Sequence, residues 1–168
     1  MDINSLNRFI EAQEQTYPVA LGEIKNGKKQ SHWMWFIFPQ LRGLGMSSTA
    51  HIYGIASLEE ARAYLAHPIL SARLLEISEA LLEQKNKKPE EIFAYVDAMK
   101  LRSSMTLFAL ISDDGSVFHK VLACFYEGQM DERTLELIKT QLSDDETIDI
   151  VAKCVLEKYR KAFEKLAE

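Results

Sequence analysis

The fold class turns on residues 31–48, which read SHWMWFIFPQLRGLGMSS. The six consecutive apolar residues Trp33–Phe38 suit either a short helix or a buried strand, because a run of this length has no diagnostic period. The two glycines that follow predict an irregular loop reaching to about Tyr53. A strand at Trp33–Phe38, and with it a mixed α+β fold, would require a second extended segment for pairing, and the sequence offers none.

The rest of the chain shows the spacing of amphipathic helices instead of strand alternation. Residues 5–15 predict a first helix, and Pro18 suits the first turn of a second helix that ends near Gly27. A further helix, at about 145–167, carries one apolar stripe: Ile148, Val151, Val155, Tyr159, Phe163 and Leu166. The predicted fold is all-α, a compact single domain spanning 1–168 with about seven to nine helices.

Composition narrows the classes of function. Apolar residues make up 47% and charged residues 27% of the 168 residues, as in an ordinary globular protein. The net charge of −5 argues against binding to duplex nucleic acid. No signal peptide or bilayer-spanning run is visible, so we expect a cytoplasmic protein that binds no membrane. The lysines at 25, 28 and 29 are interpreted as a solvated loop.

The first group of candidate functional residues lies on a predicted helix from about Phe93 to Ile111. Asp97, Lys100 and Ser104 share one face of that helix with large apolar residues, which places charged groups at least partly inside. Asp97 and Lys100 are therefore the candidate catalytic residues, and Glu23 is the alternative carboxylate. The competing interpretation is a structural Asp97–Lys100 salt bridge, with Ser104 bonded back to a carbonyl.

The second group lies in the opening stretch. Trp33 and Trp35 diverge by about 200° on a helix, so we expect one ring to turn inward and the other toward the glycine loop. An accessible indole could stack on a planar ring, while Gln40 offers an amide donor and acceptor. The predicted ligand-binding residues are His32, Trp33, Trp35, Gln40, Ser47, Ser48, Ser103 and Ser104. The histidines and cysteines follow no metal-binding spacing, so no metal or cofactor is expected.

Several long motifs occur in an order that carries a family resemblance. They include Phe9-x-x-Ala12-Gln13, Tyr17-x-x-Ala20-Leu21-x-Glu23-Ile24-x-x-Gly27-x-Lys29, Ser31-His32-Trp33-Met34-Trp35-Phe36-Ile37-Phe38-Pro39-Gln40, Gly43-Leu44-Gly45-x-Ser47, Glu60-Ala61-x-x-Tyr64-Leu65-x-His67-Pro68 and Asp97-x-x-Lys100-x-x-Ser103-Ser104. Through them, residues 5–142 resemble the bacterial domain-of-unknown-function 1810 family. The resemblance implies an all-α, single-domain cytoplasmic protein. Some members are labelled calpastatin, but that inhibitor is disordered and a chain of this apolar content is not of that kind.

The helical plan, with Ala12-Gln13 on the first helix, is also similar to domains thought to cleave N-glycosidic bonds in ADP-ribose derivatives. The leading hypothesis is therefore a pocket for a nucleotide-like or ADP-ribose-like small molecule, with N-glycosidic hydrolysis as its enzymatic form. The alternative is a non-catalytic interaction or structural module. In that case the C-terminal apolar stripe would contact a partner or a second copy of the chain.

Overall fold

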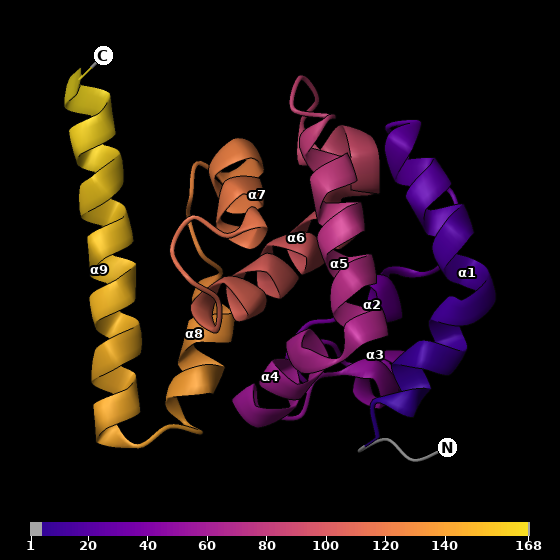
Figure 1. The fold of residues 1–168 in the computed structure, drawn as a ribbon, viewed down its shortest axis with the longest axis horizontal. Coiled ribbons are helices and arrows are strands. Elements are labelled where there is room, and N and C mark those ends of the chain that lie inside the picture. Colours follow the sequence, from indigo (N-terminus) through magenta and orange to yellow (C-terminus); the bar gives the residue numbers. More distant parts are fainter. Residues whose placement is uncertain (1–4, 168) are drawn as a thin grey trace.

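The computed structural model describes residues 5–167, with side chains through Cys154 and at Leu166. Within that range the chain forms nine α-helices (Figure 1). They are α1 (Asn7–Lys25), α2 (Met34–Ile37), α3 (Ser48–Tyr53), α4 (Leu58–Ala66), α5 (Pro68–Leu82), α6 (Pro89–Leu110), α7 (Val117–Tyr126), α8 (Glu132–Lys139) and α9 (Asp144–Ala167). The described residues contain no strand, only an isolated parallel bridge between Leu41 and Ile55. The all-α prediction is confirmed.

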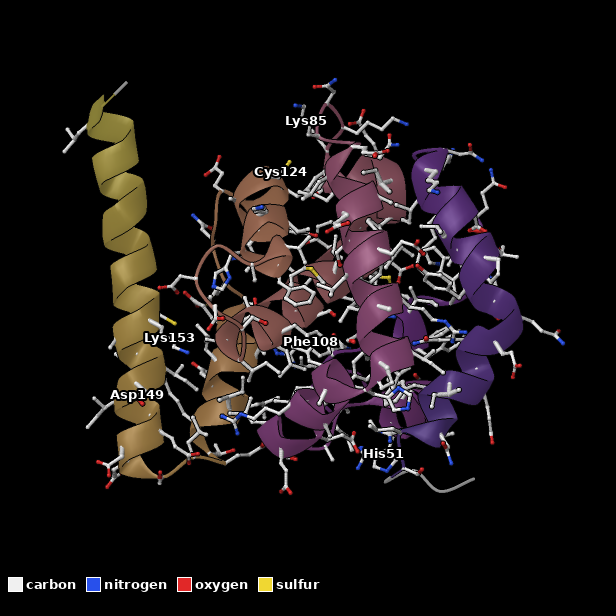
Figure 2. All side chains as sticks on the ribbon, in the orientation of Figure 1. His51, Lys85, Phe108, Cys124, Asp149 and Lys153 are labelled. Atoms are coloured by element: carbon white, nitrogen blue, oxygen red, sulfur yellow. The ribbon has the colours of Figure 1, made fainter. Side chains whose placement is uncertain are left out.

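Helix α6 runs through the middle of the molecule, with α5 and α1 on one side of it and α7 and α8 on the other (Figure 1). Its C-terminal half is buried on every side, because 103–110 are all buried. Phe108, near the centre of Figure 2, is 0% exposed and packs against the rings of Tyr64 and Phe118. A helix that is apolar all round is expected to be surrounded by other helices, as α6 is.

The prediction of two helices before residue 27 is wrong, because α1 continues through Pro18. A proline inside a helix removes one hydrogen bond and normally bends or ends the helix. Here the residues on both sides of Pro18 bury a single face, which Phe9, Gln13, Tyr17 and Ile24 share. Packing of that face on the rest of the protein outweighs the local cost of the proline.

The stretch that left the fold class open is helical. Residues Met34–Ile37 form the one-turn helix α2. The predicted loop up to Tyr53 is only half correct, because Ser47 caps the short helix α3 by accepting the N–H of Ala50. The carbonyl of Gln40, in the loop between the two helices, accepts the N–H of Ile55, just after α3, at 2.9 Å. This bond fixes the position of Gln40.

A buried arginine fastens the start of α1 to the segment after α3. Arg8 is 1% exposed, and its Nη2 lies 2.6 Å from Oε1 of Glu60. The same guanidinium donates to the carbonyls of Ser5, Ile52 and Gly54 at 2.7–2.9 Å. A β-carbon on Gly54 would lie 2.7 Å from the Cα of Arg42, so this close approach of two backbones needs glycine.

Helix α9 forms the edge of the molecule opposite α1 (Figure 1). Ile150 and Cys154 pack against the core cluster, whereas Ile148, Val151 and Leu166 are exposed. The predicted stripe also includes Val155, Tyr159 and Phe163, whose side chains lie outside the described residues. Within residues 5–167, no helix combines the length and apolar character that a bilayer span requires.

Replacement of Arg8 by Met should lower the free energy of unfolding by about 3–5 kcal/mol, because it leaves the Glu60 carboxylate and three carbonyls without their shared donor. Chemical denaturation measures this change. Arg62→Met, which removes an exposed arginine from α4, is the control and should change stability by less than about 0.5 kcal/mol. A loss below about 1 kcal/mol for Arg8→Met would show that the ion pair does not hold the two segments together.

Candidate functional site

The loop between α1 and α2 is folded around one carboxylate. Glu23, in the last turn of α1, accepts the backbone N–H groups of Gln30 and Ser31 at 2.6 and 2.7 Å. The Ser31 hydroxyl donates to the same carboxylate at 2.7 Å, and the indole Nε1–H of Trp33 donates to it at 3.0 Å. Four donors therefore converge on Glu23 from three residues of the following segment.

Trp33 is the inward-facing tryptophan. Its side chain is 0% exposed, and its ring centre lies 6.2 Å from that of Phe38 and 6.4 Å from that of Phe93. Because its indole N–H has Glu23 as acceptor, the one polar atom of this buried side chain is satisfied. Trp33 is therefore part of the core, and it cannot present a stacking surface to a ligand in this conformation.

The hydrogen bonds to Glu23 change its acidity. Partial burial alone would raise the pKa of this carboxyl, but the donors from Gln30, Ser31 and Trp33 favour the charged form and outweigh burial. The pKa is lowered from 4.5 to about 2. A carboxylate with so many donors and so low a pKa is poorly suited to take up a proton. Glu23 is therefore the anchor of the loop, and Asp97 remains the candidate catalytic carboxylate.

Helix α6 is interrupted at Ala94, whose φ of 60° and ψ of 173° are rare for a residue with a side chain. Just before the break, the Ile92 carbonyl accepts the backbone N–H of Lys29 at 2.8 Å. The prediction of one regular helix face from Phe93 onward is therefore wrong in its first turn, because the 100° periodicity does not run through Ala94. The break lets the loop that Glu23 anchors dock onto α6.

Asp97, three residues after the break, lies between two lysines. Its Oδ2 is 3.0 Å from Nζ of Lys29, and its Oδ1 is 3.5 Å from Nζ of Lys100. The Lys29 side chain is 9% exposed, against 23% for Lys100. The Asp97–Lys100 pair was predicted from helical spacing, whereas the closer and more buried pair, Lys29–Asp97, was not.

Trp35 turns toward the surface beside this ion cluster. It is partly exposed, and Nζ of Lys100 lies 5.2 Å from its ring centre, within cation–π range. Trp35, Gln40 and Lys100 line one cavity of about 10 Å³. That volume holds about one water molecule, so the cavity admits a single small group and not a whole ligand. Its other lining residues are Met34, Phe38, Ala50, Tyr53 and Gly54.

The remaining predicted site residues do not line this cavity. His32 and Ser48 are exposed, and Ser47 caps α3. Ser103 is buried and donates to the carbonyl of Met99 at 3.2 Å. Ser104 is 0% exposed, and its hydroxyl has no hydrogen-bond partner among the described residues. The interpretation that Ser104 bonds back to a carbonyl is therefore wrong, and Ser103 makes that bond instead.

The role of Lys29 in the site was not predicted, because the lysines at 25, 28 and 29 were interpreted as a solvated loop. Its Nζ donates to the carbonyl of Ser31 at 2.6 Å and lies 5.1 Å from the ring centre of Trp33, besides pairing with Asp97. The local charge run gave no sign of this role, because the ion-pair partner Asp97 and the backbone partner Ile92 are both distant in the sequence. With Lys29 included, the ion cluster holds two ammonium groups, from Lys29 and Lys100, on either side of the Asp97 carboxylate.

A wider groove, of about 510 Å³, opens elsewhere between α5 and the start of α7. Leu75 and Phe118 contribute apolar surface to it, and its charged lining residues are Asp113 and Asp114. None of the predicted site residues lines this groove, and its acidic rim opposes an anionic ligand. Among the described residues, no cluster of three or more His, Cys, Asp or Glu side chains is placed to hold a metal ion.

Replacement of Glu23 by Gln should lower the free energy of unfolding near neutral pH by about 2 kcal/mol, since hydrogen bonds to charged groups contribute about 1.5–3 kcal/mol. The folded-state pKa of about 2 lies below the ordinary 4.5, so the contribution of Glu23 is complete above pH 4.5 and lost as the pH falls toward 2. Denaturation curves across that window should show the difference between parent and variant shrinking. Glu14→Gln, an exposed position on the same helix, is the control. A difference that stays constant with pH would contradict the role of Glu23.

Comparison with known proteins places the chain in a family. Residues 3–138 match the family model described as "Protein of unknown function (DUF1810)". The chain is similar to the conserved hypothetical protein Rv1873 from Mycobacterium tuberculosis, solved by crystallography at 1.38 Å, with 47% identity, 82% of this chain and 99% of that chain covered, and a TM-score of 0.79. No curated protein matches the chain. The family match covers most of the sequence and every residue of the site. The chain therefore belongs to the DUF1810 family, the family that its sequence motifs resemble.

Proposed function

We propose that the surface formed by Trp35, Gln40, Asp97 and Lys100 binds a small ligand with a planar ring and an anionic group, of the nucleotide or ADP-ribose class. The observation that carries the proposal is the partly exposed Trp35 ring with the Lys100 ammonium 5.2 Å from its centre. An accessible indole next to a cation offers stacking and charge to one ligand at the same time.

The charges favour an anion. Lys29 and Lys100 together carry one more positive charge than Asp97 balances. The ammonium group of Lys29 is paired with the Asp97 carboxylate at 3.0 Å. Lys100, the more exposed of the two lysines, is then the group that meets a phosphate. Gln40 lines the same cavity, and its side-chain amide can donate one hydrogen bond to a base and accept another from it.

The small cavity limits how such a ligand binds. With room for about one water molecule, it accepts one polar group, while the ring lies against the exposed part of Trp35. Affinity would therefore come from stacking and from the cation, with little from enclosure. Closer enclosure would require movement of α3, which contributes Ala50 and Tyr53 to the lining.

In the enzymatic form of this proposal, Asp97 stabilises the oxocarbenium-like centre or activates the water that glycosidic cleavage requires. The two lysines hold the Asp97 carboxylate in place through their ion pairs, and Lys100 also holds the ligand phosphate. Glu23 has a different role, as the anchor of the loop. The cytoplasm is the compartment we propose, and the two cysteines, Cys124 and Cys154, which form no disulfide, are typical of a reducing environment.

One observation favours the alternative function, a non-catalytic interaction module. Tyr95, Val96 and Met99 are 68, 62 and 50% exposed, and all three lie on α6 next to Asp97 and Lys100. Exposed apolar residues grouped in this way are typical of protein-interaction surfaces. On this alternative, the ion cluster would form the polar rim of a contact and hold no small ligand.

A thermal-shift titration with ADP-ribose and with AMP tests the proposal. Ligand at about 100 times its dissociation constant stabilises the protein by about 2.7 kcal/mol. We expect Trp35→Ala to weaken binding by about 1–3 kcal/mol while the fold survives, because it removes a partly exposed stacking surface. Trp33→Phe should instead lower the melting temperature and leave any remaining affinity near that of the parent.

Tyr95→Ala is the matched control, since it removes an exposed ring from the same region without touching the cavity. It should leave the ligand-induced shift unchanged. If neither ADP-ribose nor AMP shifts the melting temperature, the nucleotide proposal fails and the interaction module is favoured. If both tryptophan variants lose stability and neither changes affinity, the binding site lies elsewhere.

A further inference from the structure

Helix α9 exposes apolar side chains along its outer face. Ile148 is 64% exposed, Val151 is 43% exposed and Leu166 is 83% exposed. Ile148 and Leu166 are eighteen residues apart, which is about five helical turns, so they lie on one line along the helix. Ile148, Val151 and Leu166 therefore offer exposed apolar surface at the two ends of this line.

The opposite side of α9 meets the rest of the protein. Ile150 and Cys154 pack against the core cluster, and Sγ of Cys154 lies 3.8 Å from Sδ of Met130. Ile150 is about 200° around the helix from Ile148, so the inner and outer contacts are on opposite faces. A surface helix with one apolar face needs one partner, whereas α9 has an outer face that no described residue covers.

The charges along α9 divide by sign. From Asp144 to Asp149 the sequence places four carboxylates and no basic residue. From Lys153 to Glu168 it places five basic and three acidic residues. If two copies of this helix paired in parallel, the acidic ends would meet and repel each other. Antiparallel pairing sets each acidic end against the basic end of the other copy.

We propose that the outer face of α9 is a self-association surface, on which a second copy of this chain docks its own α9 in antiparallel orientation. Antiparallel pairing of identical helices is two-fold symmetric, so both copies use the same surface and the assembly closes as a dimer. The family match ends at residue 138, before α9 begins, so this surface is a feature of the present chain beyond the matched region. Because α9 lies at the edge opposite α1, the dimer leaves the Trp35 surface open (Figure 1).

Sedimentation equilibrium of the full chain tests the proposal. The parent protein should form a dimer within the micromolar range or below it, where specific interfaces of standard size associate. Ile148→Glu should give a monomer whose melting temperature is close to that of the dissociated parent, since this residue makes no core contact. Val19→Glu, at a half-exposed valine of α1, is the matched control and should remain dimeric. A parent chain that is monomeric up to about 100 µM, or a dimer that Ile148→Glu leaves intact, would overturn the proposal.

Charge reversal tests the antiparallel orientation separately. Asp149, labelled on α9 in Figure 2, lies in the acidic end of the helix. Replacement of Asp145 and Asp149 by Lys should weaken the dimer by tenfold or more, because like charges then face each other. Adding Lys158→Glu and Arg160→Glu to the same chain should restore it. A parallel pair would respond differently, since like charges would meet both before and after the first reversal. An unchanged dissociation constant would therefore contradict the antiparallel arrangement.

Discussion

The carboxylate of Glu23 is the constraint on which the candidate site depends. Its four hydrogen bonds fold the loop after α1 and hold the indole of Trp33 in the core. That loop carries Lys29, whose backbone N–H docks on Ile92 and whose ammonium group reaches Asp97. Without this anchor, Asp97 and Lys100 would be an ordinary pair on a helix surface. With it, residues from α1, from α6 and from the loop after α1 form a single polar unit.

Local features of this structure could be predicted from the sequence. The helical class follows from short-range spacing. So do the ends of α4, where the Ser57 hydroxyl accepts the N–H of Glu60 and His67, the residue before Pro68, ends the helix. The Asp97–Lys100 pair belongs to the same group, because partners three residues apart meet on any helix. The different exposure of Trp33 and Trp35 also follows from their spacing, since residues two apart point in nearly opposite directions and only one of those directions leads into the core here.

Features that depend on distant partners could not be predicted. Arg8 is buried because Glu60, fifty-two residues away, and three carbonyls surround it, and an isolated arginine near a helix start gives no sign of that. The ion pair of Lys29 could not be predicted for the same reason, because its partner Asp97 is distant in the sequence and Lys29 lies in a run of lysines. The break at Ala94 was missed because alanine is a good helix former, so only the packing of the 27–31 loop explains its unusual backbone. Pro18 shows the reverse case, in which a local signal was clear and packing overrode it.

The arrangement separates the tasks of the two edges of the molecule. At one edge, near α1 and α2, the accessible indole of Trp35 and the ammonium group of Lys100 form the surface proposed to bind a small anionic ligand. At the other edge, α9 exposes Ile148, Val151 and Leu166 outside the family-matched residues. The core between them is built around α6, which supplies Asp97 and Lys100 in its middle and buried residues toward its end. One helix thus links the site to the stability of the whole domain.

The central claim is that Lys29 and Asp97, from different parts of the chain, act as one unit. A double-mutant cycle with Lys29→Met, Asp97→Asn and the double variant measures it directly, through free energies of unfolding. We predict a coupling energy of about 1–3 kcal/mol, as for residues in contact within one ion-pair network. Losses that add within about 0.5 kcal/mol would mean that the two residues are independent, and would contradict this account of the site.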